Sequence, residues 1–228
     1  PAAALPDAPH PAAAARGVVA GAAARRLLSG IEHVESVVVT SREQAAELAG
    51  RWGRSFLKVE SEAHPHKTEL ALVEGPLDRA SAGAAYARLA ERRSAIDAAA
   101  PIVMQPAVGG VELALGAYHD PTFGPAVMVA TGGIFLEIVR DARFALAPLD
   151  EEAALRLIRS LRGAPLLLGA RGRPRADVRA AACALAALSR FIADADGAYS
   201  SVDVNPLMVR EEGKGAVAVD AIAFPAEA

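Results

Sequence analysis

The chain has 228 residues, with 24 basic and 27 acidic side chains and a net charge of −3 at pH 7. This near-neutral balance, without any basic block, argues against nucleic-acid binding. No apolar run approaches the roughly 18 residues that a membrane span needs, so we expect no membrane span. The single cysteine, Cys183, excludes a disulfide framework and predicts a reducing, cytoplasmic compartment. Its alanine-rich helical surroundings predict a buried, inert thiol.

The basic residues are divided very unevenly between the two types. Only three are lysine, and two of these, Lys58 and Lys67, lie within ten residues of each other. Arginine and lysine are not interchangeable, because lysine carries a compact point charge. We therefore interpret the remaining lysines as weak markers of a site that requires an ammonium group, with Lys214 in an expected hairpin turn as the exception.

The first half of the chain begins with a Pro/Ala-rich, aperiodic stretch over residues 1–16, which predicts a flexible linker. Order is expected from Gly17. Ser41 and Gln44 form a capping box, which predicts the start of a helix that runs to Arg51. The other expected elements are a helix over 18–28, strands over 33–39, 56–59 and 70–73, a loop over 60–69, and a helix over 81–98.

The second half alternates short apolar runs with turn signals. We expect strands over 102–105, 111–117, 125–131, 134–139 and 143–147, helices over 150–162 and 176–194, and a hairpin of strands over 199–209 and 216–224. Strands and helices that are segregated in this way predict an α+β fold with largely antiparallel sheets.

One candidate site is the segment over residues 56–69, which holds two of the three lysines and two of the five histidines. A lysine on a strand, Lys58, can place a positive charge against phosphate oxygens. His66, beside Lys67, can contact the same phosphates or accept a phosphoryl group. The alternative is a solvated, charged loop.

A second candidate is the segment Asp203-Val204-Asn205-Pro206, with Asp220 on the next strand. Strand alternation places Asp203 and Asn205 on the same face. Carboxylate and amide oxygens of this kind suit Mg²⁺ that is shared with substrate phosphates. The alternative is turn chemistry, because Asn-Pro often opens a turn.

Two weaker signals accompany these candidates. The adjacent glycines Gly132 and Gly133 let the backbone approach a ligand closely, although a tight turn would need them equally. The strand that ends in residues 105–108 exposes backbone groups, and the Glu112 carboxylate that follows can bind a ribose.

These motifs occur in a recognisable order between about Arg25 and Phe224. They include Leu57-Lys58-Val59, His66-Lys67-Thr68-Glu69, Gly110-Val111-Glu112-Leu113, Gly132-Gly133-Ile134-Phe135-Leu136-Glu137, Gly169-Ala170-Arg171-Gly172 and Asp203-Val204-Asn205-Pro206-Leu207. In this order and spacing the chain resembles the ATP-grasp domain of NDP-forming acyl-CoA synthetases. The resemblance is to the β subunit of ADP-forming acetate–CoA ligase, which is related to the succinyl-CoA ligase β subunit.

The resemblance implies two α+β lobes that clasp a nucleotide, a smaller one over about 17–104 and a larger one over about 105–228. It implies that Lys58 holds the nucleotide phosphates and that His66 relays the phosphoryl group. Asn205 and Asp220, with Asp203 nearby, are the implied Mg²⁺ ligands. The full set of implied nucleotide-binding residues is Lys58, Lys67, Gln105, Pro106, Ala107, Val108, Glu112, Gly132, Gly133 and Glu137.

The implied function is the ATP/ADP-binding half of an enzyme that converts acid, CoA and ATP into acyl-CoA, ADP and phosphate. Such a half requires a CoA-binding α subunit or domain, and the resemblance implies a hetero- or homo-oligomer. The alternative is a degenerate ATP-grasp domain that acts as a regulatory sensor, for example in a protein fused to an acetyltransferase.

Three residues depart from the pattern of the family. Ala71 and Leu72 stand where the family usually has two glycines, and Ala145 stands where it usually has arginine. We expect Leu72 to crowd a loop that approaches phosphate. We also expect Ala145 to remove a phosphate-facing charge, since Arg143 is displaced by two residues.

Overall fold

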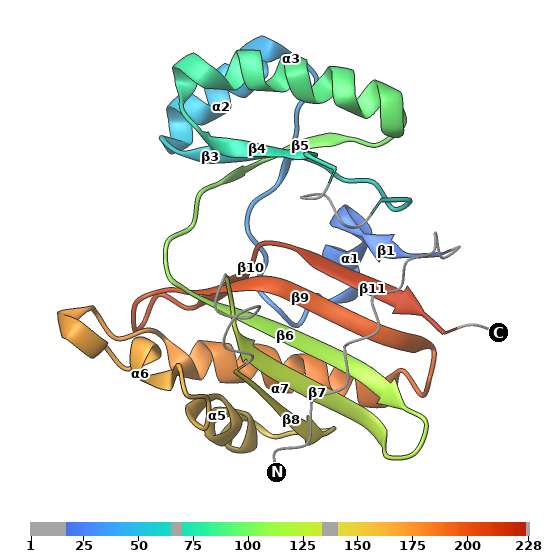
Figure 1. Ribbon diagram of the computed structural model, residues 1–228, viewed down its shortest axis with the longest axis vertical. Helices are drawn as coiled ribbons and strands as arrows, with labels where there is room; N and C mark the ends of the chain where they lie inside the picture. The colour runs from blue at the N-terminus through green and yellow to red at the C-terminus, as the bar shows by residue number, and fades with distance from the viewer. Residues whose placement is uncertain (1–16, 65–69, 134–140, 227–228) are drawn as a thin grey trace.

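The computed structural model describes residues 17–64, 70–133 and 141–226, and it has two lobes (Figure 1). Within these residues, seven strands form the sheet of the larger lobe and four strands form that of the smaller lobe. The pairing of the strands in both sheets is antiparallel. The predicted α+β class with two mainly antiparallel sheets is therefore confirmed. The predicted linker over 1–16 and the strand over 134–139 lie outside the described residues.

The larger sheet has the strand order β1-β11-β9-β6-β7-β8, and β10 also pairs with β9. Its strands are β1 (Val19–Ala20), β6 (Val111–Asp120), β7 (Gly124–Thr131), β8 (Ala142–Leu146), β9 (Tyr199–Val209), β10 (Ala216–Ala218) and β11 (Ala221–Pro225). The accompanying helices are α1 (Gly21–Leu27), α5 (Glu151–Arg159), α6 (Ala164–Leu167), the 3₁₀ turn η1 (Ala170–Gly172) and α7 (Val178–Asp194). None of the described helices is long and apolar enough to cross a membrane.

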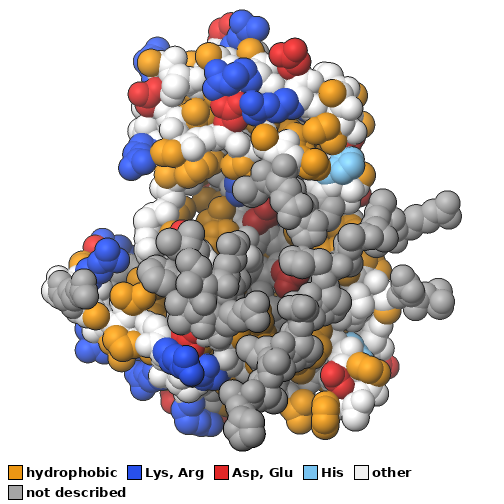
Figure 2. Space-filling model, in the orientation of Figure 1, with side chains coloured by type: hydrophobic (Ala, Val, Ile, Leu, Met, Phe, Trp, Pro, Cys, Tyr) orange, Lys and Arg blue, Asp and Glu red, His pale blue; other side chains and the backbone are white. Residues whose placement is uncertain are grey.

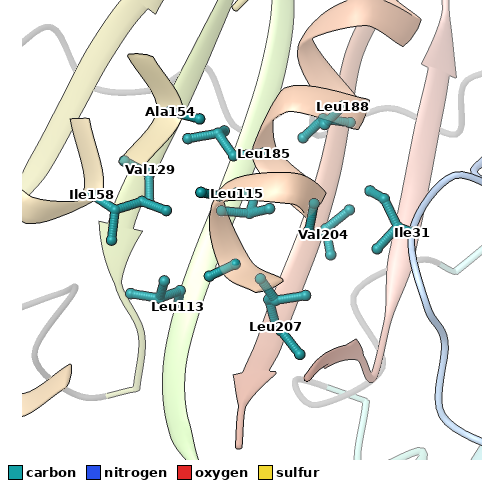
Figure 3. Close-up of a cluster of buried hydrophobic side chains, with 14 of the residues drawn as sticks. Ile31, Leu113, Leu115, Val129, Ala154, Ile158, Leu185, Leu188, Val204 and Leu207 are labelled. Atoms are coloured by element: carbon teal, nitrogen blue, oxygen red, sulfur yellow. The ribbon is translucent and has the colours of Figure 1, made fainter. Parts of the chain in front are cut away.

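The core of the larger lobe lies between α7 and one face of the sheet. Figure 3 shows Leu185 and Leu188 of α7 near Leu115 of β6 and Val204 of β9, and all four side chains are fully buried. Fully burying a side chain of this size stabilises the fold by about 1.5–3 kcal/mol. Because this face of β6 and β9 is apolar, the alternate side chains of these strands point away from α7.

The smaller lobe repeats this arrangement with the sheet order β2-β5-β3-β4. Its elements are β2 (Val37–Val38), α2 (Arg42–Trp52), β3 (Ser55–Val59), β4 (Val73–Leu77), α3 (Arg79–Ile96) and β5 (Ile102–Pro106). Leu57 and Met104 belong to the apolar core under α2 and α3. The alternate residues Phe56, Lys58 and Gln105 therefore point away from these helices, toward the larger lobe (Figure 1).

Local signals in the sequence account for the helix starts. The Ser41 hydroxyl accepts a hydrogen bond from the Gln44 amide at 3.1 Å, as the capping box predicts. The second hydrogen bond of a capping box would join the Gln44 side chain to the Ser41 amide. In the structure the Gln44 side-chain oxygen accepts from the Thr40 amide instead, at 2.9 Å. Asp150 caps α5 through the Ala153 amide at 2.7 Å. These side chains satisfy amide groups that the first turn of a helix leaves unpaired.

The structure corrects the predicted division into lobes. β1 pairs with β11 of the larger sheet, and Ala24 and Leu28 belong to the larger core. The chain enters the smaller lobe only after Val34, whose amide donates to the Ala218 carbonyl at 2.9 Å. The smaller lobe therefore spans about the range 37–106 rather than 17–104, because the chain from residue 17 to about residue 34 belongs to the larger lobe.

Several predicted elements differ in their bounds. β4 covers 73–77 rather than 70–73, since Gly75 and Pro76 are tolerated on a strand at the sheet edge. The predicted strand over 216–224 is two strands, β10 and β11. The short helix α6 was not predicted. Cys183 is exposed rather than buried, because it lies on the outer stripe of α7.

Leu72 does not crowd the loop that precedes β4. Its side chain is fully buried in the core of the smaller lobe, so it anchors this stretch of chain. The unusual residue is its neighbour Ala71, which has a φ of 52°. An L-residue in this left-handed region costs about 1–2 kcal/mol, and glycine avoids that cost. The departure from the family pattern is therefore a local backbone strain.

Replacing Leu72 with alanine is expected to lower the free energy of unfolding by about 2–5 kcal/mol, because a cavity would remain in the smaller core. Leu70→Ala is a matched control, since Leu70 is 39% exposed. The control is expected to change the free energy of unfolding by about 0.5 kcal/mol or less. Urea denaturation measures both values, and equal losses would contradict the assignment of Leu72 to the core.

Candidate functional site

Among the described residues, helices cover one face of the smaller sheet, and Lys58 lies on its other face, which is turned toward the larger lobe (Figure 1). Its side chain is largely enclosed, with an exposure of 7%. Val103 is its partner in the ladder between β3 and β5, and Gln105 lies two residues farther along the same face. Figure 2 shows acidic side chains in the space between the lobes. An ammonium group is thus held facing a space that is lined by polar groups.

Oxygen ligands gather on the helix-free face of the larger sheet. Asp203 and Asn205 are exposed there, between the buried valines of β9. The Asn205 amide donates to the Asp220 carbonyl at 3.1 Å, which places these two residues directly opposite each other. Opposed residues of this kind have Cβ atoms about 4.5–5.5 Å apart. The structure thus brings Asn205 and Asp220 together, as predicted, with Asp203 on the same face.

This donor set fits a magnesium ion. It supplies two carboxylates and an amide oxygen, and the described residues hold no group of three or more His, Cys, Asp or Glu side chains that would form a dedicated metal cage. Mg²⁺ usually binds through one or two carboxylates and completes its coordination with water and substrate phosphates.

Glu112 and the glycine pair also come together. The Gly132 amide donates to the Glu112 carbonyl at 2.8 Å. A Cβ added at Gly132 would lie 2.8 Å from the Glu112 Cβ, which is too close for a side chain. Gly133 has a φ of 69°, which also favours glycine. The adjacent glycines are therefore required by close packing against β6, and the exposed Glu112 side chain lies beside them.

Gln105 holds the hinge between the lobes. Its side chain is 2% exposed, and Nε2 donates to Ser36 Oγ at 2.7 Å and to the Val219 carbonyl at 3.3 Å. Oε1 is buried, and no described residue donates a hydrogen bond to it. A buried polar atom without a partner is costly, so Oε1 is an acceptor that a ligand can satisfy.

A groove of about 610 Å³ lies beside this hinge. The Ala107 amide is already bonded to the Arg54 carbonyl at 2.8 Å. The groove is lined by Trp52, Gly53, Arg54, Phe56, Pro76, Ala107, Val108 and Gly109. These mainly apolar and aromatic walls suit a flat heterocycle.

His66, Lys67 and Glu137 lie outside the described residues. Ala145 pairs with Val127 and packs against the larger core, so its side chain points to the helix-covered face. The expectation that Ala145 removes a phosphate-facing charge is therefore wrong, because a side chain at this position of β8 points away from the face that carries Asp203.

The comparisons with known proteins agree with this geometry. A family model described as an ATP-grasp domain matches residues 11–223. The chain belongs to the ATP-grasp family. Within this family it is similar to the β subunits or domains of ADP-forming acetate–CoA ligases.

Curated relatives support this branch. The β subunit of ADP-forming acetate–CoA ligase II from Pyrococcus furiosus is 39% identical over 112 residues, which cover 49% of this chain and 48% of the relative. The ADP-forming acetate–CoA ligase of Methanocaldococcus jannaschii is 27% identical over 208 residues, which cover 87% of this chain and 29% of the relative. The match thus covers about half the length of the first relative and less than a third of the length of the second.

A solved structure extends the likeness across both lobes. It is the dinucleotide forming acetyl-coenzyme A synthetase 1 of Ca. Korarchaeum cryptofilum, in complex with coenzyme A and Ca-AMPCP. The identity is 30%, the TM-score is 0.79, and the match covers 91% of this chain and 93% of the other. Another structure of that protein holds Mg-AMPPCP, with a phosphohistidine segment that points towards the nucleotide binding site.

Sequence reasoning missed two buried carboxylates that join distant segments of the chain. Asp141 is 2% exposed and accepts hydrogen bonds from the amides of Arg162 at 3.0 Å and Gly163 at 2.8 Å. Glu60, next to Lys58 on the same face, pairs with Arg25. These partners lie 21 to 35 residues apart, and no short motif in the sequence signals them.

Two titratable groups near the site have shifted pKa values. Burial lowers the pKa of His33, and the hydrogen bond to the Leu28 carbonyl opposes this effect. The hydrogen bond from the Ser61 hydroxyl lowers the pKa of Asp97. Asp97 therefore stays ionised at neutral pH, where it holds Ser61, the residue that follows Glu60.

Replacing Gly132 with alanine is expected to destabilise the protein by about 1–3 kcal/mol, because the new Cβ would overlap Glu112. Gly109→Ala is the matched control, since no atom lies within 4 Å of an added Cβ there. Thermal unfolding compares the two variants. A Gly132→Ala variant as stable as the Gly109→Ala variant would contradict the close packing of Gly132 on β6.

The pKa shift of His33 predicts a pH dependence of stability. The unfolded state binds more protons than the folded state below the usual pKa of 6.5, so stability should fall as the pH drops from there toward the lowered pKa. Urea unfolding at several pH values should show that His33→Gln reduces this loss. His119→Gln, at an exposed position, should leave it unchanged. An equal slope in all three proteins would contradict the prediction.

Proposed function

We propose that the chain is the nucleotide-binding half of an NDP-forming acyl-CoA synthetase. The reaction interconverts acid, CoA and ATP with acyl-CoA, ADP and phosphate. Two observations carry the proposal. Lys58 is largely enclosed on the face of the smaller sheet that the described helices leave uncovered, and the Asn205 amide donates to the Asp220 carbonyl at one strand of the larger sheet. The Korarchaeum relative with bound Mg-AMPPCP supports it, because the likeness extends over both lobes.

The nucleotide is proposed to lie between the two sheets. The groove beside Phe56, Ala107 and Val108 would accommodate the base, and Gln105 Oε1 would accept a hydrogen bond from an exocyclic amino group. Adenine has an amino donor at position 6 of the ring, where guanine has a carbonyl acceptor, so a base placed with this position at Oε1 would make ADP preferred to GDP. Glu112 would accept hydrogen bonds from the ribose hydroxyls.

The phosphates would extend toward Lys58, whose ammonium offsets their negative charge. Gly132 and Gly133, with Glu137 and Lys67, would line the phosphate path. Asn205, Asp220 and Asp203 would hold Mg²⁺, which when bound neutralises charge on the transferring phosphoryl group.

His66 is proposed to relay the phosphoryl group. A ring nitrogen of His66 attacks the γ-phosphorus of ATP, a nitrogen–phosphorus bond forms, and the bond between that phosphorus and the bridging oxygen breaks. ADP then leaves with the electron pair. The group passes onward to a CoA-binding α subunit or domain, which the chain must bind in order to complete the cycle. This partnership is supported by the β-subunit relatives of Pyrococcus furiosus.

A sensor role is the second candidate, and Ala71 favours it. The positive φ of this residue places strain next to the segment that carries His66. Such strain can slow phosphoryl transfer and leave nucleotide binding intact. A regulatory ATP-grasp domain within a larger protein would therefore bind Mg-ADP without forming phosphohistidine.

Labelling with radioactive γ-phosphate of ATP tests the enzyme proposal directly. In the presence of Mg²⁺ we expect an acid-labile, base-stable label on the protein. His66→Ala should abolish the label, and Lys58→Met should slow labelling about 100-fold because one charged donor to the phosphates is lost. His64→Ala is the matched control, since this histidine lies two residues away and should not be needed.

The results separate the two candidates. Binding of Mg-ADP without any label would overturn the relay and favour the sensor. A label that survives in the His66→Ala variant would contradict the assigned histidine. Absence of Mg-ADP binding up to millimolar concentrations would contradict both candidates.

A further inference from the structure

An ion pair joins the two lobes at a point distant from the hinge. Arg25 belongs to α1 of the larger lobe, and Glu60 follows β3 of the smaller lobe. Arg25 Nη1 lies 2.5 Å from Glu60 Oε1, and Nη2 lies 3.1 Å from Oε2. The guanidinium therefore donates a hydrogen bond to each of the two carboxylate oxygens. In Figure 1, α1 lies on the side of the larger lobe that faces the smaller lobe.

The surroundings of this pair make it stronger than an ordinary surface ion pair. The Glu60 side chain is only 5% exposed and that of Arg25 is 22% exposed. An exposed pair contributes little to stability because water screens it. A carboxylate that is withdrawn from water depends on its partner, and a bidentate guanidinium fixes both distance and orientation.

The sequence of α1 makes room for the Glu60 carboxylate. Gly21, the first residue of α1, has a φ of 55°, and a Cβ added there would overlap Glu60 Oε2. Any other residue at position 21 would push Glu60 away from Arg25. Two features of α1, the missing side chain at Gly21 and the arginine one turn later, thus serve the same contact.

The anchored segment carries residues of the proposed site. Glu60 lies two residues after Lys58 and on the same face of the chain. The next residue, Ser61, donates to Asp97 Oδ2 at 2.6 Å and accepts from the His64 amide at 3.1 Å. Residues 58–64 are thus attached to the larger lobe through Arg25 and to the end of α3 through Asp97.

We propose that Arg25 and Glu60 are positioning residues that set the separation between Lys58 and the oxygen ligands of the larger lobe. The role rests on the proposed function, since the ligand that spans this separation is Mg-nucleotide. The contacts of Gln105 and the Arg25–Glu60 ion pair connect the lobes at opposite ends of the ladder between β3 and β5, because Gln105 pairs with Phe56 and Glu60 follows Val59. With both in place, the lobes are held at the spacing that a polyphosphate bridges.

A distance measurement tests the anchor without any ligand. Cys183 is exposed on α7, and Ser94 is exposed on α3, so Ser94→Cys gives one spin-label site in each lobe. The chain has no other cysteine. Arg25→Met and Glu60→Gln are expected to broaden the distribution of distances between the labels. Arg26→Met is the matched control, because the adjacent Arg26 is exposed and should leave the distribution unchanged.

Calorimetry with Mg-ADP then tests the positioning role, at a temperature where all variants are folded. Arg25→Met should weaken binding about tenfold, which corresponds to about 1.4 kcal/mol. Arg25→Lys keeps the charge but loses the planar fork, so it should fall between the wild type and Arg25→Met. Arg26→Met should bind as the wild type does. A pair that served only folding stability would leave the affinity of the folded protein unchanged.

The outcomes separate the anchor from the proposed function. An unchanged distance distribution in the Arg25→Met and Glu60→Gln variants overturns the anchor. A broadened distribution with unchanged Mg-ADP affinity overturns the positioning role. If the wild type does not bind Mg-ADP, the proposed function and the positioning role both fail, and the distance measurement alone decides whether the pair joins the lobes.

Discussion

In the part of the chain that the structure describes, helices cover one face of each sheet, and the candidate site depends on that constraint. The period of two along a strand sends alternate side chains into a helix-covered core and into the space between the lobes. Leu57 and Val204 face their cores, so their neighbours Lys58 and Asn205 must face the other way. Burial of the apolar half of each strand thereby fixes the direction of the polar half. The candidate site is formed by the strand side chains that do not enter either of the two apolar cores.

This constraint explains how much could be predicted from the sequence. Alternation within β9 indicated that Asp203 and Asn205 share a face, and the hairpin indicated that Asp220 lies across from them; the structure pairs Asp220 with Asn205. The role of Leu72 could not be predicted, because motif comparison notes a missing glycine and does not reveal which core receives the new side chain. Cys183 was misplaced for a related reason. Its helix is so rich in alanine that the buried and exposed stripes look alike in the sequence.

Contacts between segments that are distant in the sequence could not be predicted either. Nothing local in the sequence shows that β1 completes the larger sheet, or that Arg25 reaches across to Glu60. Both depend on how the two lobes are packed. The scarcity of lysine was informative by comparison. Lys58 is enclosed on the face of the smaller sheet that is turned toward the larger lobe, whereas the exposed Lys214 pairs with Glu211 in a turn, so one of the two described lysines lies in the candidate site.

We propose that the larger sheet holds Mg²⁺ for a nucleotide that Lys58 contacts from the other lobe. The most direct test is a calorimetric titration with ADP, with and without Mg²⁺, of the wild type and of Asp220→Asn. We expect Mg²⁺ to tighten ADP binding in the wild type and in the exposed control Asp194→Asn, and to have little effect in Asp220→Asn. An ADP affinity that does not depend on Mg²⁺ in the wild type, or an unchanged Mg²⁺ effect in Asp220→Asn, would contradict it.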